Sequence, residues 1–277
     1  MPELTLGFSP CPNDTFIFHA LVNGIIPAGG LAFRERLEDV ESLNQLVLDR
    51  ILDISKISFH LLGHIRDDYA LLRSGGALGR GCGPLVVARD RFDPRELRGK
   101  RVAIPGRYTT ACLLLRLFDP ALGPLVIMPF HEIMEAVARG DVDAGVIIHE
   151  SRFTYRGYGL HALLDLGEWW EGETGRPIPL GGIVARRSLG TQLLTAVEDA
   201  LRESVLFAQS HPGEATGYIR SHSREMSDEV CAAHIKLYVN RYTVELGSDG
   251  EAAVATLLER AEAAAIIPRS SHSPFID

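Results

Sequence analysis

Short apolar runs that end in polar residues alternate along this chain with segments of helical periodicity. The run Leu4–Phe8 stops at Ser9–Pro12, and a helix is predicted over Thr15–Val22 with Asn13 and Asp14 as its caps. Strands that alternate with helices are typical of an α/β fold, in which helices cover both faces of a mainly parallel sheet.

Apolar residues at helical spacing predict further elements of the same two kinds. Ile51–Ile54 leads into a second strand that ends in Ser55–Ser58. Val102–Ile104 is predicted as another strand, and Ala111–Leu115 begins a helix. The remaining predicted helices are one capped by Asp39 and containing Val40, Leu43 and Val47, a long one over 191–210, and three near Pro212–Ser221, Asp228–Val239 and Glu251–Ala264.

A helix, a turn and an apolar strand recur about ninety residues after their first appearance. Ile133–Ala138 has an apolar helical face, Gly140 ends it, and Val142–Ile148 follows as a buried strand. Leu85–Arg89 also resembles Gly182–Arg186. These repeats predict two similar lobes, each with a mainly parallel sheet, around a ligand cleft.

The two similar apolar runs are expected to cross between the lobes, near residues 85–90 and 182–187. Lobe one would then contain residues 1–87 and 187–277, and therefore both ends of the chain. Lobe two would be inserted as residues 88–186.

The glycine-rich segment 74–84 is interpreted as a flexible approach to the first crossing rather than as an anion-binding loop, because it lacks the Lys-Ser/Thr of a phosphate loop.

Composition narrows the classes of partner. The 277 residues are 46% hydrophobic and 23% charged, with a formal charge of −8 and no run of basic residues. Nucleic acid and acidic membrane surfaces are therefore excluded as expected partners, whereas a small acidic molecule is compatible with a few local donors. The oligomeric state is left open. No apolar segment approaches the roughly 18 residues needed to span a bilayer.

The cysteines and the first residues bear on cofactors and location. The four cysteines are scattered without a C-x-x-C pair, which favours buried thiols over a metal cluster or a disulfide framework. His60 and His64 lie four apart, but no third ligand is evident, and no metal site is predicted. The N-terminus shows no secretory signal, so a cytoplasmic protein is expected.

Ligands of open parallel sheets bind beyond the carboxyl ends of the strands. Each of the four predicted strand ends carries hydrogen-bond donors or titratable side chains, which is hard to explain by solubility alone. The candidates that follow the four strands are Ser9, Asn13 and Asp14; Ser55, Lys56, Ile57 and Ser58; Thr109 and Thr110; and His149, Glu150 and Arg152.

Several of these candidates have a structural alternative. Thr109 and Thr110 precede a helix, whose free N–H groups suit a carboxylate, but a plain threonine cap explains them as well. Lys56 is either an anion ligand or a surface charge. Asp14 is favoured as a helix cap over a chemical role.

His149 is the strongest catalytic candidate. It follows three apolar residues directly, so its imidazole is expected to project from a rigid strand. An ordinary pKa near 6.5 lets histidine accept a proton at neutral pH and return it later. The alternative is a strand-end histidine that bonds a backbone carbonyl.

Four strings of the sequence resemble one family, the 1,4-dihydroxy-6-naphthoate synthases of the futalosine route of bacterial menaquinone biosynthesis. The strings are Ser9–Phe18, Leu37–Glu41, Arg73–Gly79 and Ile147–Tyr155, and the similarity runs from about residue 4 to 240. The last fifteen residues carry no recognisable motif.

The resemblance implies the two-lobed fold of type-II periplasmic binding proteins, used inside the cell. It implies a carbon–carbon lyase that converts cyclic dehypoxanthinyl futalosine to 1,4-dihydroxy-6-naphthoate and a three-carbon fragment without metal or organic cofactor. The family's proton-accepting histidine falls on His149. Its substrate contacts fall on Ser55–Ile57 and on Thr109 and Thr110.

Two alternatives to a synthase stay open at this point. A non-catalytic solute-binding protein of the same fold needs no titrating group in its cleft. Chorismate dehydratase, an enzyme of the same pathway, shares the fold and an acidic substrate. The string His149–Arg152 favours the synthase. Ser58, Asn13, Asp14 and Arg152 are added as substrate contacts from their places at strand ends.

Overall fold

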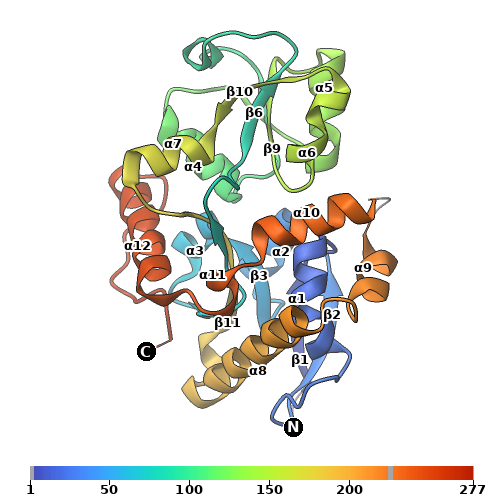
Figure 1. The fold of residues 1–277 in the computed structure, drawn as a ribbon. Coiled ribbons are helices and arrows are strands. Elements are labelled where there is room, and N and C mark those ends of the chain that lie inside the picture. The colour runs from blue at the N-terminus through green and yellow to red at the C-terminus, as the bar shows by residue number, and fades with distance from the viewer. Residues whose placement is uncertain (1–2, 224–226, 277) are drawn as a thin grey trace.

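The computed structural model describes residues 3–223 and 227–276, which form two α/β lobes, each built on its own sheet. Figure 1 shows the second sheet above the first, with the segments near β6 and β11 running between them. The predicted two-lobed α/β architecture is confirmed.

The first sheet has the strand order β2-β1-β3-β11-β4, and β5 also pairs with β11. β1, β2 and β3 are parallel, whereas β11 runs antiparallel to β3, β4 and β5. The bounds of the six strands are β1 (Glu3–Phe8), β2 (Ala32–Leu37), β3 (Ile54–Ser58), β4 (Tyr69–Leu71), β5 (Ala77–Gly79) and β11 (Ile178–Arg186).

The second sheet has the order β10-β6-β9-β7-β8. Again three strands, β8, β7 and β9, are parallel, while β6 is antiparallel to β9 and to β10. The expected parallel pairing therefore holds for three neighbouring strands in each lobe, and antiparallel strands complete both sheets. The bounds are β6 (Leu85–Ala88), β7 (Val102–Ile104), β8 (Leu125–Ile127), β9 (Ala144–Ile147) and β10 (His161–Asp165).

Helices connect the strands and cover the sheets (Figure 1). The α-helices are α1 (Pro12–Val22), α2 (Val40–Leu48), α3 (Phe59–Ile65), α4 (Thr110–Phe118), α5 (Ile133–Arg139), α6 (Ser151–Thr154), α7 (Leu166–Thr174), α8 (Thr191–Ser210), α9 (Thr216–His222), α10 (Asp228–Tyr238), α11 (Arg241–Val244) and α12 (Gly247–Ala263). Short 3-10 helices are η1 (Pro94–Leu97), η2 (Phe130–Glu132), η3 (Tyr155–Tyr158) and η4 (Arg187–Leu189).

The chain changes sheets a few residues earlier than the similar apolar runs suggest. β6 lies wholly in the second sheet and β11 wholly in the first, so the changes fall between β5 and β6 and between α7 and β11. The predicted limits at 87/88 and 186/187 thus lie within β6 and at the end of β11. The two runs resemble each other because both are buried strands, and apolar content alone does not say to which sheet a strand belongs.

Most predicted helix ends are confirmed. The Asp39 side chain caps α2 by accepting from the N–H groups of Glu41 and Ser42. Gly140 ends α5 in the left-handed conformation, with φ of 85°, and α8 spans the predicted residues 191–210. The largely polar strand β2 was not predicted. It lies exposed at the edge of the sheet, so its sequence contains no apolar run that would indicate a strand.

One local prediction in the first lobe is wrong. α1 begins at Pro12 behind Cys11, with no side-chain cap, so Asn13 and Asp14 lie inside its first turn. Proline suits this position, because the first N–H of a helix has no intrahelical acceptor and its absence costs no hydrogen bond. The predicted strand that ends in Ser55–Ser58 is confirmed as β3.

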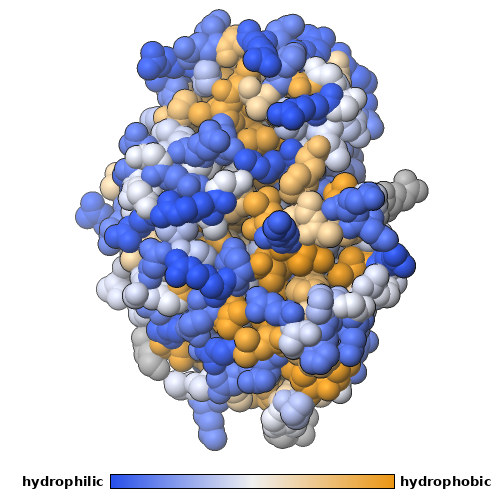
Figure 2. Space-filling model, in the orientation of Figure 1, coloured by the Kyte–Doolittle hydropathy of each residue, from blue (hydrophilic) through white to orange (hydrophobic). Residues whose placement is uncertain are grey.

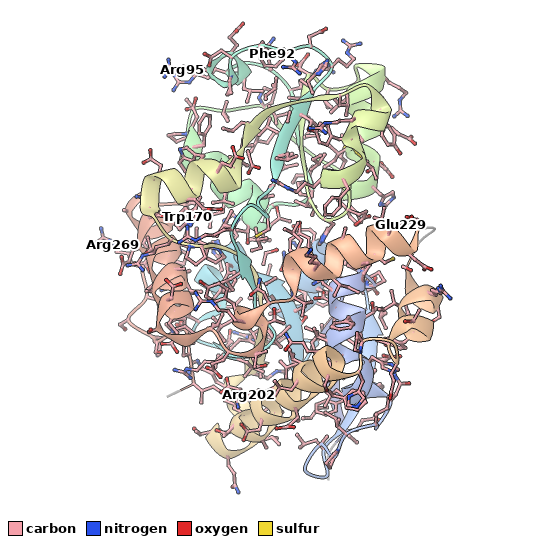
Figure 3. The ribbon with its side chains drawn as sticks, in the orientation of Figure 1. Phe92, Arg95, Trp170, Arg202, Glu229 and Arg269 are labelled. Carbon is pink, nitrogen blue, oxygen red and sulfur yellow. The ribbon has the colours of Figure 1, made fainter. Side chains whose placement is uncertain are left out.

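An apolar cluster joins the lobes on one side of the molecule. It contains Ile57 and Leu257 from the first lobe together with Leu113 and Trp170 from the second. Trp170 lies on α7 next to α12 (Figure 3), with its indole N–H donating to the carbonyl of Pro177 at 3.1 Å. Figure 2 shows hydrophobic residues along the middle of the face seen, with hydrophilic residues around them.

Within the described residues, no helix is long and apolar enough to cross a membrane.

We expect Trp170→Ala to lower the free energy of unfolding by about 3–5 kcal/mol, because Trp170 is fully buried in the cluster that both lobes share. Urea unfolding followed by circular dichroism measures this change. Glu168→Ala, at an exposed position of the same helix, is the control and should change it by less than about 0.5 kcal/mol. Equal effects of the two substitutions would contradict the packing role.

Candidate active site

A cavity of about 80 Å³ lies between the two sheets, where β1, β3, β7 and β9 end. Ten of the twelve strand-end candidates line it, whereas Ser55 does not and Glu150 lines a neighbouring hollow. The ten are Ser9, Asn13, Asp14, Lys56, Ile57, Ser58, Thr109, Thr110, His149 and Arg152. The strand-end rule therefore brings together residues from both lobes.

A second, larger hollow of about 540 Å³ adjoins the cavity. Both lobes contribute to it, through Glu38 and Asp39 on one side and Pro129 and Phe130 on the other. Adjacent residues line the two spaces, as His149 and Glu150 do, so the larger hollow lies beside the smaller one. The lobes thus meet tightly over the inner cavity and stand apart beside it.

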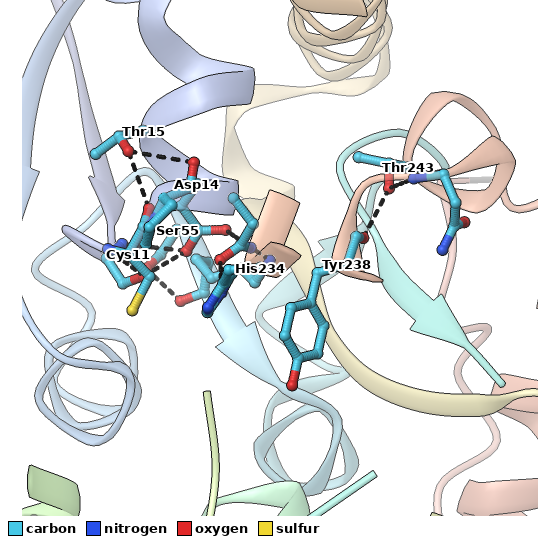
Figure 4. Close-up of polar contacts among 12 residues, drawn as sticks. Cys11, Asp14, Thr15, Ser55, His234, Tyr238 and Thr243 are labelled. Carbon is cyan, nitrogen blue, oxygen red and sulfur yellow. Dashed lines mark hydrogen bonds and ion pairs between the residues drawn. The ribbon is translucent and has the colours of Figure 1, made fainter. Parts of the chain in front are cut away.

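The floor of the cavity holds a buried ion pair. Lys56 Nζ lies 3.0 Å from Asp14 Oδ1, and the two residues are 6% and 2% exposed. Asp14 also accepts from the Ser9 hydroxyl at 2.7 Å, from the Ser9 N–H at 3.3 Å and from Asn13 Nδ2 at 2.8 Å. Asp14 therefore connects the β1–α1 turn to β3 (Figure 4), which is the role the cap prediction missed.

The hydroxyls of the two threonines are bonded to protein groups. Thr109 Oγ1 caps α4 by accepting from the N–H of Cys112, and it donates to the carbonyl of Gly106. Thr110 Oγ1 accepts from the N–H of Phe59 at 2.9 Å and donates to the carbonyl of Leu180 at 2.6 Å.

Thr110 therefore links the second lobe to β11 and α3 of the first. Within the described residues, the backbone N–H groups of Thr110 and Ala111 have no protein acceptor and face the cavity end of α4. A helix start of this kind favours an anion. The threonine segment can thus bind a carboxylate through its amides rather than its hydroxyls.

The other predicted contact residues differ in whether their polar groups are already hydrogen-bonded to protein groups. The hydroxyl of Ser55 donates to the carbonyl of Lys56 and points away from the cavity toward Gly7. The Ser58 hydroxyl accepts from Asn44 at 3.4 Å, and its proton has no acceptor among the residues that the structure describes. Arg152 donates to Asp165 and to the carbonyl of Gly83, both at 2.6 Å, so it holds the second lobe against the first crossing.

A contact between the lobes also holds the loop before α4. The carboxylate of Glu41, on α2, accepts from the N–H groups of Arg107 at 2.9 Å and Tyr108 at 3.3 Å. The carboxyl carbon sits so close to Gly106 that a Cβ there would approach it to 2.4 Å. Burial raises the pKa of Glu41, although these hydrogen bonds oppose the change. Glycine at position 106 is what permits this approach.

His149 combines backbone strain with a free imidazole. Its φ of 56° lies in the left-handed region, which is uncommon for a residue other than glycine and is frequent at functional sites. The ring makes no hydrogen bond to any described residue, and burial lowers its pKa. His149 is therefore held neutral beside the cavity, with its nitrogens available to a ligand. The backbone-bonded alternative does not apply.

Two residues of α10 belong to the site but were not predicted. Tyr238 lines the cavity without a described partner for its hydroxyl, and burial raises its pKa. His234, one helical turn earlier, is fully buried with its ring 6.1 Å from that of His149. Their spacing of four predicts a shared helix face, but no local pattern tells which face meets His149.

Comparisons with a family model and with known proteins agree on the family to which this chain is similar. The model of a family described as menaquinone biosynthesis matches residues 4–263. A 1,4-dihydroxy-6-naphthoate synthase of Thermus thermophilus is 50% identical over 276 residues, which is 100% of both chains. A second such synthase, from Streptomyces coelicolor, is 49% identical over 270 residues, or 96% of this chain and 95% of the relative.

The fold agrees with that of periplasmic binding proteins. The alkanesulfonate-binding protein of Xanthomonas axonopodis pv. citri superimposes with a TM-score of 0.72 over 99% of this chain and 96% of its own. The two sequences are 14% identical, so the similarity concerns the fold alone.

We expect Thr110→Val to destabilise the protein and to weaken substrate binding. The valine leaves the buried N–H of Phe59 and carbonyl of Leu180 without a partner, at a cost of about 1–3 kcal/mol each. Thr110→Ser keeps both hydrogen bonds and is the control. Urea unfolding and the KM of each variant test this. A valine variant as stable as the serine variant would show that the hydroxyl does not link the lobes.

Proposed function

The chain belongs to the menaquinone biosynthesis family, and we propose that it forms 1,4-dihydroxy-6-naphthoate from cyclic dehypoxanthinyl futalosine, with release of a three-carbon fragment. The proposed reaction is a carbon–carbon cleavage that needs neither a metal nor an organic cofactor. As a step in biosynthesis, it would take place in the cytoplasm. The observation that carries the proposal is the unpaired imidazole of His149 in a cavity between the lobes.

The proposed role of His149 is that of the general base. A cleavage that ends in an aromatic ring requires a proton to be removed next to a carbonyl or from a hydroxyl-bearing carbon. A neutral imidazole with free nitrogens can accept this proton, and one well-placed base contributes about 10²–10⁴-fold to the rate. The lowered pKa keeps the imidazole unprotonated at neutral pH.

The proposed binding mode places the substrate carboxylate at the start of α4. The free N–H groups of Thr110 and Ala111 point there, and they are favoured by the positive end of the helix dipole. Lys56 gives one hydrogen bond to Asp14 and keeps two N–H donors that can face the ligand. The hydroxyls of Ser58 and Tyr238 are then available to the oxygen on which charge develops.

Closure of the lobes would exclude water from the reacting carbon. The inner cavity is small, and the lobes contact each other through Thr110 and through Glu41 against Gly106. A substrate of this size must therefore enter while these contacts are open, and the larger hollow beside the cavity marks the side from which it enters.

The direct test is incubation of the purified protein with cyclic dehypoxanthinyl futalosine, followed by mass analysis of the products. We expect 1,4-dihydroxy-6-naphthoate from the wild type. His149→Ala should lower kcat by at least about 10²-fold, while calorimetry still detects substrate binding. Wild-type protein that binds the substrate but forms no product would favour the solute-binding alternative. Dehydration of chorismate in its place would favour the sibling enzyme.

The pH dependence of kcat/KM follows from the state of the base. Because burial lowers the pKa of His149, the imidazole is neutral across pH 7–8 and becomes protonated only below its ordinary value of about 6.5. We expect kcat/KM to be constant at neutral pH and to fall on the acid side below pH 6.5. A decline that is already complete at pH 7 would contradict a neutral, desolvated base.

A further inference from the structure

Among the described residues, none gives the His149 ring the hydrogen bond that usually orients a catalytic histidine. In most such sites one ring nitrogen donates to a carboxylate or a carbonyl, which fixes the tautomer and the ring plane. Here the ring of His149 contacts two other rings instead. Phe130 lies on one side, with centroids 5.3 Å apart and planes at 65°, and His234 lies 6.1 Å away with planes at 11°.

The two neighbouring rings come from different parts of the fold. Phe130 belongs to η2, in the same lobe as the strand β9 that precedes His149. His234 lies on α10, which packs against α1 of the first lobe. The contact between the two imidazoles therefore crosses the cleft.

A chain of hydrogen bonds fixes the ring of His234. Its Nε2 lies 2.9 Å from Asn13 Oδ1. Asn13 Nδ2 donates to Asp14 Oδ1, so the Asn13 oxygen is the atom that faces the imidazole. His234 Nε2 must therefore carry the proton, and this tautomer is assigned from the bonding network. Lys56 pairs with Asp14 in turn, which connects the ring of His234 to the buried ion pair.

The other ring nitrogen of His234, Nδ1, is buried and has no hydrogen-bond partner among the described residues. The side chain is fully buried, and burial lowers its pKa to about 3, with the nearby His149 as a further cause. His234 is therefore neutral at working pH, and its near-parallel ring is a rigid surface against which His149 rests.

We propose that His234 is a positioning residue that sets the plane of the His149 imidazole across the closed cleft. This inference rests on the proposed role of His149 as the base. Because the ring contact forms only when the lobes meet, alignment of the base is coupled to enclosure of the substrate. Small displacements of reacting groups are costly, since about 1 Å can reduce the rate about 10²-fold.

The test compares His234→Gln with His234→Phe. The glutamine amide can still donate to Asn13 but presents no ring, whereas phenylalanine keeps a ring without the hydrogen bond. We expect His234→Gln to lower kcat about 10- to 100-fold with KM within about threefold of wild type. His234→Phe should recover at least part of that loss.

His19→Gln is the matched control. His19 is half-buried near the end of α1, with its ring 5.3 Å from that of Tyr218, and it does not line the cavity. This substitution should reduce thermal stability and leave kcat within about twofold of wild type. A His234→Gln variant whose kcat also stays within twofold would overturn the proposal, as would equal losses of kcat in the two glutamine variants.

A measurement on the wild type does not depend on whether the variants fold. Nitrogen-15 NMR of labelled histidine should show His234 as the neutral Nε2–H tautomer from pH 5 to 8. Protonation of Nδ1, or titration within that range, would contradict the assignment.

The two proposals can fail separately. If His149→Ala retains turnover, the proposed base is wrong. If it abolishes turnover but His234→Gln does not alter kcat, only the positioning role is wrong.

Discussion

The buried ion pair between Asp14 and Lys56 is the interaction on which the arrangement of the site depends. Two charges at 2% and 6% exposure are costly to bury, and removal of one partner from such a pair typically costs about 3–5 kcal/mol. Three further hydrogen bonds, which Asp14 accepts from Ser9 and Asn13, offset part of this cost. The same carboxylate thereby fixes the start of α1, the position of β3 and, through Asn13, the ring of His234.

The second constraint is that each lobe supplies only part of the site. The first lobe supplies the ion pair, Ser58 and the helix α10, while the second supplies His149 and the amides at the start of α4. Neither lobe contains a complete site. Thr110 and Glu41 bond across the cleft, so the groups that bind the substrate are in place only when the lobes meet. Enclosure and chemistry are thus linked through shared side chains.

Sequence alone predicted the two-lobed α/β fold and most of the polar side chains around the cavity, because strand ends carry clear polar signals. It did not predict the roles of individual side chains. Lys56 and Asp14 are 42 residues apart, and His234 and Asn13 are 221 apart. Such pairings depend on tertiary packing, which periodicity does not encode. The threonine at 110 illustrates the point, since its hydroxyl links the lobes although its position suggested a ligand contact.

The crystal structure of His149→Asn in complex with cyclic dehypoxanthinyl futalosine tests the central claim most directly. The account predicts that the substrate carboxylate lies at the backbone N–H groups of Thr110 and Ala111. It also predicts that the carbon or hydroxyl that loses its proton lies within about 3.5 Å of the place of the missing imidazole nitrogen. A substrate bound wholly in the outer hollow beside Glu38 and Asp39, with its reactive carbon away from position 149, would contradict the account.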